Sequence, residues 1–435
     1  MKRNDKGTTK KKILLSIGIS LFVLFANYIV GNTSFPLPNE MEVLKDWDKF
    51  QKWIGKDSDS IPNEVLLVNV AFDKQLVDYN EDGMPVGQYA ITDRQKLLDF
   101  LTFAQQSDSY KYIFLDVIFE QGIESPYDSA LFRKIASMPR IVIPVHEDTP
   151  LQDSILYVKA ANADYTVTCE ETNFARFQFI HNGIKSMPLR MYEDISGNSI
   201  SKWGILYFCN HWLCRNGITL KMPIKMSNLT EETGDMKKCN VLNLGVDLLA
   251  MDTIAPIVDE IKDKIVVIGN YKDDVHDTYV GLQSGSIISL NAYYALERGD
   301  HLIWGNYGVL FFFLLMAIVY FFISIAYLNG FSLSAKTDNP WLKLLLSLVS
   351  INVVFWTIAI LAYISPLDIV YNVWLPIIVF TLLDFIINIY SSYKKQKDEK
   401  TTTITITTTD GTNGECSEEG THLQGALHEP SPNSD

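Results

Sequence analysis

The sequence lacks the local motifs that mark the commonest catalytic sites. It contains no H-E-x-x-H zinc motif, no G-x-x-x-x-G-K-[ST] phosphate loop, no G-x-G-x-x-G dinucleotide motif and no G-x-S-x-G nucleophile elbow. Histidine is scarce, with seven in the chain, and no second histidine stands at metal-ligand spacing from His276. We therefore predict no catalytic centre, no bound metal and no cofactor.

Basic residues are also in the minority. The chain has 37 Lys and Arg against 51 Asp and Glu, and a formal net charge of −14. Nucleic-acid binding requires a basic surface, so this balance excludes nucleic acid as an expected partner. The acidic excess belongs mainly to the central region and the C-terminal tail.

Cysteine is rare, and no C-x-x-C motif supports a thioredoxin-like or zinc-ribbon site. Cys416 lies in the tail, and the other four cysteines lie in the central region: Cys169, Cys209, Cys214 and Cys239. Two interpretations stay open, disulfides in an oxidising compartment or buried free thiols. The first predicts a Cys209–Cys214 bond. Because these residues would face different directions on a continuous helix, that bond requires a break near 211–212.

What the chain does have is four long apolar segments. They are 13–30, 309–328, 344–364 and 369–390. A helix needs roughly 20 apolar residues to cross the hydrocarbon core, and lipid forces such a segment to be helical. We therefore expect an integral membrane protein with four transmembrane helices in the lipid bilayer.

The flanking charges predict the orientation. Six basic residues precede the first apolar segment, and Lys394, Lys395, Lys397 and Lys400 follow the last one. Under the positive-inside rule, both 1–12 and 391–435 are cytoplasmic and 32–306 lies outside the cytoplasm. Segment 13–30 is expected to be an uncleaved anchor; a cleaved signal peptide is the alternative and leaves the domain on the same side.

Residues 32–306 read as an α/β domain. Almost continuously apolar runs predict buried strands at 64–71, 112–117, 140–145 and 264–269. Amphipathic runs predict helices at 92–105, 127–137, 254–263 and 287–298. Thr92 or Asp93 is the expected N-cap of the first helix. Strands that alternate with helices indicate a mostly parallel sheet with flanking helices.

The middle of the domain has a different pattern. Segments 155–158, 164–168 and 174–181 alternate in hydropathy, and Asn182-Gly183 is a turn signal. We expect an antiparallel element here, at the side of the sheet. The remaining expectations are a helix at 204–216, a loop at 222–240 and a strand at 241–244.

Several blocks resemble CHASE2, the extracytoplasmic sensory domain of bacterial signalling proteins. The blocks are VLLVNVAFD, ITDRQKLLDFL, YIFLDVIFEQ, YDSALFRKIA, KIVVIGNYKDDVHDTYV and GSIISLNAYYALERG. The matching positions are Arg94, Asp116, Phe119, Asp128, Leu131, Gly269, Asp277, Gly285, Asn291 and Ala292. The resemblance covers roughly 40–305, with one apolar segment before the domain and three after it. It implies a sensor in the periplasm, anchored in the bacterial inner membrane.

The chain departs from this family pattern at two places. Gly87-Gln88-Tyr89-Ala90 stands where the family has a Trp/Pro cluster before its Arg, and only 391–435 follows the last apolar segment. That tail has a basic start, then TTTITITTT and an acidic, weakly apolar end, which is typical of disorder. We therefore expect no output enzyme in it.

Candidate ligand-binding residues follow the predicted strands. Ligands of open parallel sheets bind beyond the carboxyl ends of the strands, and carboxylates there suit a cation or a polar ligand. The candidates are Asp73, Asp116, Asn270, Asp273 and Asp277, with His146 and Asp274 at the same edge. The alternative for each is a structural or solvated role. His276 is expected to be a surface histidine.

Two further predictions concern single acids. Asp116 stands in a strand that should be buried, so it requires a partner, and Arg94 is the expected one in a structural pair. Asp384 lies within the last apolar segment, close to its cytoplasmic end, where an interhelical hydrogen bond is the favoured role.

Together these features predict a sensor that detects a small extracytoplasmic ligand or an envelope state. It would signal through a separate membrane or cytoplasmic partner, with a homodimer as one arrangement. The alternatives are a structural or assembly subunit of a membrane complex and a periplasmic α/β enzyme. A pocket with converging acid and base groups would favour the enzyme.

Overall fold

The computed structural model describes 5–32, 40–55, 61–81, 84–164, 176–229, 241–249, 254–303 and residue 317. The expected apolar segments 309–328 (apart from Ala317), 344–364 and 369–390 lie outside the described residues. So do the tail 391–435, Asp384, Cys169, Cys239 and Cys416.

A six-stranded parallel sheet forms the centre of the domain. Its strand order is β14-β1-β15-β4-β5-β6. The strands are β1 (Val65–Asn69), β4 (Tyr112–Leu115), β5 (Ile141–Val145), β6 (Ala160–Asn162), β14 (Val241–Asn243) and β15 (Ile265–Gly269). These strands are almost continuously apolar because both faces of a parallel sheet are covered by other elements. The five predicted strands are confirmed, and β6 is an additional one.

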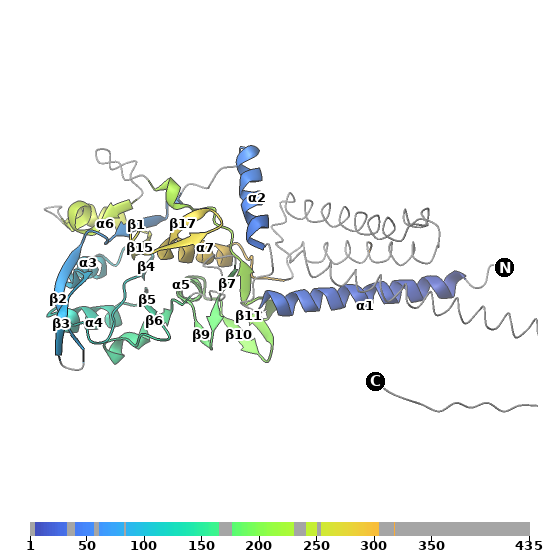
Figure 1. Ribbon diagram of the computed structural model, residues 1–435, viewed down its shortest axis with the longest axis horizontal. Coiled ribbons are helices and arrows are strands. Elements are labelled where there is room, and N and C mark those ends of the chain that lie inside the picture. The colour runs from blue at the N-terminus through green and yellow to red at the C-terminus, as the bar shows by residue number, and fades with distance from the viewer. Residues whose placement is uncertain are drawn as a thin grey trace, which may run out of the picture. The chain divides into compact units, whose positions relative to one another are not determined.

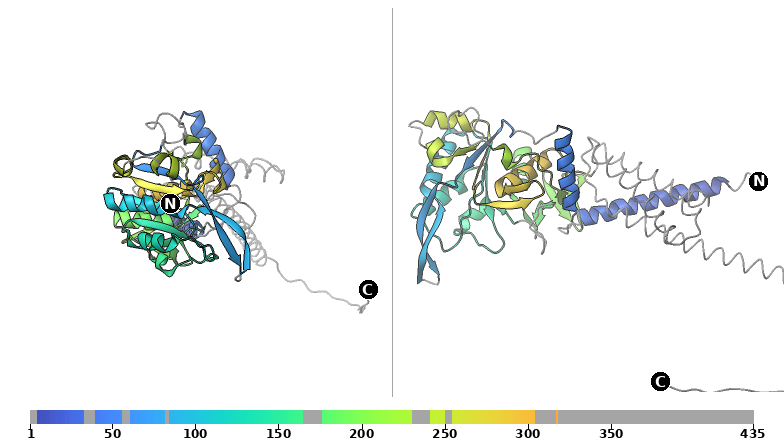
Figure 2. Two further views of the ribbon diagram at one scale, coloured as in Figure 1. Left: turned by 90° about the vertical axis from the view of Figure 1, so that its left-hand side faces the viewer. Right: turned by 45° about the horizontal axis from the view of Figure 1, so that its top comes forward.

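Helices cover both faces of the sheet (Figures 1 and 2). The first face carries α3 (Arg94–Ser107), α4 (Asp128–Ser137), α6 (Ile254–Ile261) and a π-helical turn at Leu244–Leu249; the second carries α5 (Met187–Ser196) and α7 (Gly285–Glu297). Alternate strand residues divide accordingly, since Leu66 packs with the first group and Leu67 with the second. The predicted α/β class with a mostly parallel sheet is therefore confirmed.

The start of α3 is capped as predicted. The Asp93 carboxylate accepts a hydrogen bond from the Lys96 amide at 3.1 Å. That contact satisfies one of the amide groups that a helix start leaves unpaired.

Small antiparallel elements surround the sheet. Two are the pair β8 (Ile180–His181) and β9 (Ile184–Lys185), and the pair β7 (Arg176–Gln178) and β13 (Gly217–Thr219). Asn182 and Gly183 form the predicted turn, with φ angles of 48° and 85°. The pair β16 (Val275–Thr278) and β17 (Gly281–Ser284) precedes α7.

Further elements were not predicted from the sequence. The hairpin of β2 (Lys74–Glu81) and β3 (Met84–Thr92) extends from the domain (Figures 1 and 2). Helix α2 (Glu40–Trp53) precedes the sheet. The expectation of an antiparallel strand at 155–158 is wrong, because Ser154–Val158 is a 3-10 turn. A second 3-10 turn occupies Met226–Asn228.

The predicted helix at 204–216 is wrong. This segment contains β11 (Leu206–Cys209) and β12 (Trp212–Cys214), which join β10 (Ile200–Trp203) in an antiparallel sheet. Asn210 makes the turn between β11 and β12 with a φ of 54°. Asparagine tolerates this left-handed conformation, so a two-residue turn can replace a continuous helix.

Helix α1 (Asp5–Gly31) covers the first apolar segment, which is therefore helical as expected. Within the described ranges, no helix qualifies as long and apolar enough for a membrane crossing. The end of α1 is tied to the domain. The Tyr28 hydroxyl accepts a hydrogen bond from the Tyr207 amide at 2.9 Å, and the Asn32 side chain accepts one from the Asn216 amide at 2.6 Å.

Candidate functional site

The carboxyl edge of the sheet carries a partly buried acid, Asp116, which follows β4 directly. Ser286, in the first turn of α7, donates a hydrogen bond to Asp116 Oδ2 at 2.7 Å. Gly269, the last residue of β15, makes this approach possible. A Cβ at Gly269 would stand 2.0 Å from Ser286 Oγ.

Two histidines and a second acid surround Asp116 electrostatically. Burial raises the pKa of Asp116 to about 6, and the charge of Asp274 acts in the same direction. The hydrogen bond from Ser286 and the positive charges of His146 and His276 act against this rise. An acid with such a pKa changes charge near neutrality, which marks functional-site candidates only statistically.

Each histidine has its own carboxylate. His146 Nδ1 lies 2.8 Å from Asp164 Oδ1, and the Glu147 amide donates to the other Asp164 oxygen at 2.7 Å. His276 Nε2 lies 3.2 Å from Asp274 Oδ1. An acid that hydrogen-bonds one ring nitrogen fixes the tautomer and leaves the other nitrogen for a second contact. We use the name carboxyl-edge cluster for Asp116, His146, Asp164, Asp274, His276 and Ser286.

The other half of this edge is a saturated structural network. Asn69 Nδ2 donates to the Asn243 side chain at 3.1 Å, and Asn69 Oδ1 accepts from the Ala71 amide at 3.0 Å. Asn243 in turn donates its backbone and side-chain N–H groups to Asp247. These groups link β1 and β14 and satisfy one another.

Asp73, a predicted ligand-binding residue, belongs to this structural half. Lys96 Nζ lies 2.6 Å from Asp73 Oδ1, and the Gly245 amide donates to Asp73 Oδ2 at 3.0 Å. A Cβ on Gly245 would stand 2.2 Å from Asp73 Oδ1, so a larger residue there would displace the Asp73 carboxylate from its contacts. Asp73 therefore joins α3 to the π-helical turn.

The three other predicted residues lie on the chain after β15. Asn270 Oδ1 accepts from the amides of Lys272 and Asp273, and Asn270 Nδ2 donates to the exposed Asp273 carboxylate at 3.1 Å. Asp277 is exposed on β16, opposite Leu282. Asn270 and Asp273 therefore shape the turn that carries Asp274, and of the five predicted residues Asp116 is the one in the cluster.

The predicted pair of Arg94 with Asp116 is wrong, because Arg94 pairs with Asp128. Arg94 Nε lies 3.5 Å from Asp128 Oδ1, both side chains are buried, and the guanidinium stacks over the Phe119 ring at 4.4 Å. Arg94 also donates to the Ile118 carbonyl at 3.1 Å. The chain after β4 turns back toward the start of α3, which brings Asp128 within reach while Asp116 faces α7.

Three members of the cluster were missed from the sequence: Ser286, Asp164 and His276, which was expected to be a surface histidine and pairs with Asp274. Ser286 follows Ser284-Gly285, and Ser284 is the N-cap of α7. That capping pattern was the available signal for a polar side chain at this edge. Asp164 follows β6, a strand that sequence periodicity did not predict, so nothing placed it beside His146.

Comparisons with family models, curated proteins and solved structures find no match. In the part of the chain that the structure describes, no group of three His, Cys, Asp or Glu side chains is placed to hold a metal ion. The carboxyl-edge cluster is therefore interpreted from its own geometry, as a site for protons or for hydrogen bonds to a polar molecule.

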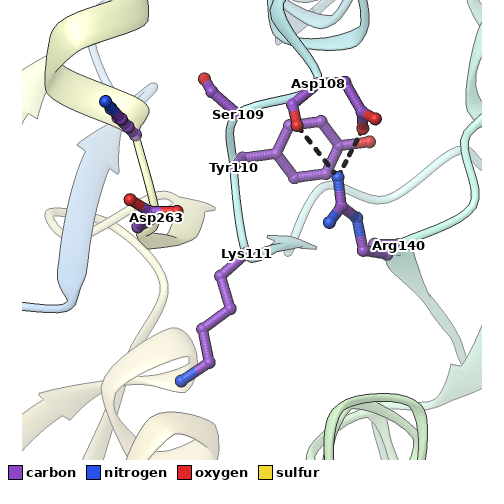
Figure 3. Close-up of a pocket in the computed structure, with 7 residues that line it drawn as sticks. Asp108, Ser109, Tyr110, Lys111, Arg140 and Asp263 are labelled. Carbon is purple, nitrogen blue, oxygen red and sulfur yellow. Dashed lines mark hydrogen bonds and ion pairs between the residues drawn. The ribbon is translucent and has the colours of Figure 1, made fainter.

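A hollow lies at the opposite, amino edge of the sheet (Figure 3). Its lining residues are Asp108, Ser109, Tyr110, Lys111, Arg140, Lys262 and Asp263. Arg140 stacks over the Tyr110 ring at 4.8 Å and forms an ion pair with Asp108. This pair is well exposed, and such pairs contribute little. Since parallel sheets bind ligands at the carboxyl edge, we favour the cluster around Asp116 as the site.

Cys209 and Cys214 are buried free thiols, so the predicted bond between them is not formed. Cys209 lies opposite Trp212 and Cys214 opposite Tyr207, which makes the two cysteines diagonal rather than direct neighbours. Burial raises the pKa of Cys214 to about 12, so its reactive thiolate form is suppressed.

Proposed function

We propose that this protein is a membrane-anchored, CHASE2-like sensor. Residues 32–306 lie outside the cytoplasm of a bacterial cell and respond, through the carboxyl-edge cluster, to a small polar ligand or to the proton activity of the envelope. The response passes to a separate signalling partner.

The observation that carries this proposal is the course of α7. The helix begins at Gly285, carries Ser286 of the cluster in its first turn and ends at Glu297, and 301–303 then run beside β12. The Arg215 amide donates to the His301 carbonyl at 2.7 Å, and the Ile303 amide donates to the Leu213 carbonyl at 3.3 Å. One helix thus connects the cluster to the chain that leads into segment 309–328.

The small sheet of β10, β11 and β12 also holds the end of α1. The Tyr207 amide of β11 donates a hydrogen bond to the Tyr28 hydroxyl, and the Leu213 carbonyl of β12 accepts one from the Ile303 amide. A displacement of α7 would therefore reach both chain segments that are expected to enter the membrane. Eleven residues of α7 are buried, so a displacement of this helix would be transmitted to the elements packed against it.

Membrane anchoring is supported by the four apolar segments, by their basic flanks and by the surface of α1. Six large apolar side chains of α1 are exposed: Ile13, Leu14, Leu15, Leu21, Phe22 and Phe25. Such a row of exposed apolar groups requires cover by lipid or protein. None of the described helices is long and apolar enough to cross a membrane, so the proposal of four transmembrane helices rests on the sequence.

The mechanism follows from the hydrogen bond between Ser286 and Asp116. Protonation of Asp116, or a ligand that replaces Ser286 at its carboxylate, weakens this contact at the start of α7. Two positions of α7 then differ in free energy, and a ligand shifts their populations by its difference in affinity for them.

Hydrogen exchange tests this coupling in the full chain in lipid nanodiscs. Asp116→Asn imitates the protonated acid, and Asp78→Asn, at an exposed acid of β2, is the matched control. We expect Asp116→Asn to change the exchange of the amides of Leu213, Arg215 and Ile303, which the control leaves unchanged. Changes confined to the loops around Asp116, or none at all, would contradict a sensor that works through α7.

The rival functions make different predictions. A structural subunit in a complex, or a homodimer without a ligand response, gives a stable co-purifying partner and no exchange difference. A periplasmic enzyme requires turnover that Asp116→Asn abolishes. Purification of the full chain in mild detergent identifies the partner, and the presence or absence of the exchange difference separates the sensor from the first two.

A further inference from the structure

The β10–β12 sheet has an apolar outer face. Paired strand residues share a face, so Ile200, Tyr207, Cys209 and Cys214 form the inner side, and all four are buried. The opposite side carries Trp203, Leu206, Phe208 and Leu213. Antiparallel sheets with one packed face normally present polar residues on the other. This outer face has large apolar residues instead.

Exposure is greatest at the tip of the sheet. Trp203 is 75 % exposed, and Ile205, in the turn between β10 and β11, is 60 % exposed. Trp212 is also 67 % exposed, but it pairs with Cys209, and the exposed Lys202 pairs with Tyr207, so both belong to the inner side of the sheet. The tip of the outer face therefore presents one indole and one isoleucine.

The place of this sheet in the chain points to its partner. Its strands hold the end of α1 through Tyr28 and the chain before segment 309–328 through Ile303. Both connections to the expected membrane segments therefore converge on one small sheet. Tryptophan is enriched where a protein meets the headgroup region, because indole has an apolar body and one N–H donor.

We propose that the outer face of the β10–β12 sheet rests in the interfacial layer of the lipid bilayer. Trp203 lies at the headgroup level, and Ile205 beside it inserts among the lipids. This inference rests on the membrane anchoring proposed above. It adds a peripheral contact that holds the sheet at a fixed distance from the bilayer surface. Displacements of α7 are then transmitted to a sheet that the bilayer supports.

Spin labels test this contact in the full chain, reconstituted in phosphatidylethanolamine–phosphatidylglycerol vesicles. Cys169, Cys239 and Cys416 are replaced by Ser, and single labels are placed at Ile205→Cys or at Leu76→Cys. Leu76 is a matched control, because it is 66 % exposed on the β2–β3 hairpin. Oxygen concentrates in lipid and a nickel chelate in water, so collision rates with the two report the surroundings of each label.

The expected result is that oxygen outcompetes the nickel chelate at position 205 and that the reverse holds at position 76. Equal access of the chelate to both labels overturns the lipid contact. A label at 205 that neither reagent reaches indicates a protein partner and also overturns it. If the chain is absent from the membrane fraction after alkaline washing, the proposed membrane anchoring fails together with this inference.

The native indoles give an independent reading. Brominated lipids quench the fluorescence of tryptophans that contact them, and Trp203→Phe removes one of the eight tryptophans while keeping an aromatic side chain. Trp212→Phe, on the inner side, is the matched control. We expect Trp203→Phe to lose a measurable part of the quenchable emission that the control keeps. An unchanged quenchable fraction in a folded, membrane-inserted variant would exclude interfacial indoles.

Discussion

At the scale of single residues, Asp116 sets a distinct pH dependence. Its pKa is raised from 3.8 to about 6 by burial, so the folded state keeps a proton that the unfolded state has lost. Its contribution to stability is full below pH 3.8 and is lost as the pH rises through about 6. Asp116→Asn should therefore raise the melting temperature at about pH 8 and have little effect at about pH 4. Thermal melts at both pH values check this, and a less stable variant at about pH 8 would contradict it.

His301 has the opposite pH dependence. It is fully buried, beside the Tyr192 ring at 5.7 Å, and burial lowers its pKa from 6.5 to about 4. Between these two pH values His301 is protonated in the unfolded state and neutral in the folded state. The free energy of unfolding therefore falls as the pH drops from 6.5 to 4. The difference between these two pKa values corresponds to roughly 3 kcal/mol of stability.

His301→Phe keeps the ring and removes the titration. Denaturant unfolding between about pH 4 and about pH 7 should show a shallower loss of free energy on acidification than in the wild type. Identical slopes for the two proteins would show that His301 is protonated without cost in the folded state.

Gly269 tests the contact between β15 and α7. A Cβ there would stand 2.0 Å from Ser286 Oγ, so Gly269→Ala should cost roughly 1–3 kcal/mol, as overpacking generally does. Adding Ser286→Ala removes the clashing oxygen and should recover most of that loss. Chemical unfolding of the two single variants and the double variant measures the coupling, and purely additive losses would argue against the close approach.

At the scale of elements, the buried ion pair of Arg94 and Asp128 joins the starts of α3 and α4. Removing one partner of a buried pair costs roughly 3–5 kcal/mol, and lysine cannot reproduce the stacked guanidinium over Phe119. Arg94→Lys and Asp128→Asn should each lower the unfolding midpoint and together lose less than the sum. Arg94→Lys with Asp116→Asn should be additive, since these residues are not paired. Coupling in the second pair and not the first would reverse this assignment.

The sequence predicted those elements whose pattern depends on local periodicity. Residues 65–69 and 265–269 are continuously apolar because the sheet is covered on both faces, and Asp93 caps α3 because the first amide groups of a helix need an acceptor. The helix prediction for 204–216 failed because the strands in this segment carry apolar residues on both faces. The alternation of apolar and polar residues that identifies a surface strand is therefore missing.

The candidate site was predicted only in part, for a similar reason. Asp116 follows a recognisable strand, whereas its neighbours come from α7 and from the chain after β15, which are distant in sequence. The partner of Arg94 depends on the course of 116–128, an irregular segment with no periodicity to read. Local patterns therefore located one acid at the edge, and tertiary packing determined what surrounds it.

At the scale of the whole molecule, every proposal depends on the placement of 32–306 outside the cytoplasm. The Lys and Arg flanks of the apolar segments predict this orientation, and the sensor role and the lipid contact of the β10–β12 sheet both require it. No other property of the chain decides so much about its function.

Cysteine labelling of intact cells tests that placement most directly. In a chain with Cys169, Cys239 and Cys416 replaced by Ser, a single cysteine is placed at the exposed Leu76 or at Gly411. A membrane-impermeant maleimide should label Leu76→Cys in intact cells and Gly411→Cys only after the cells are opened. Labelling of Gly411→Cys alone in intact cells would contradict the orientation, and with it the extracytoplasmic sensor.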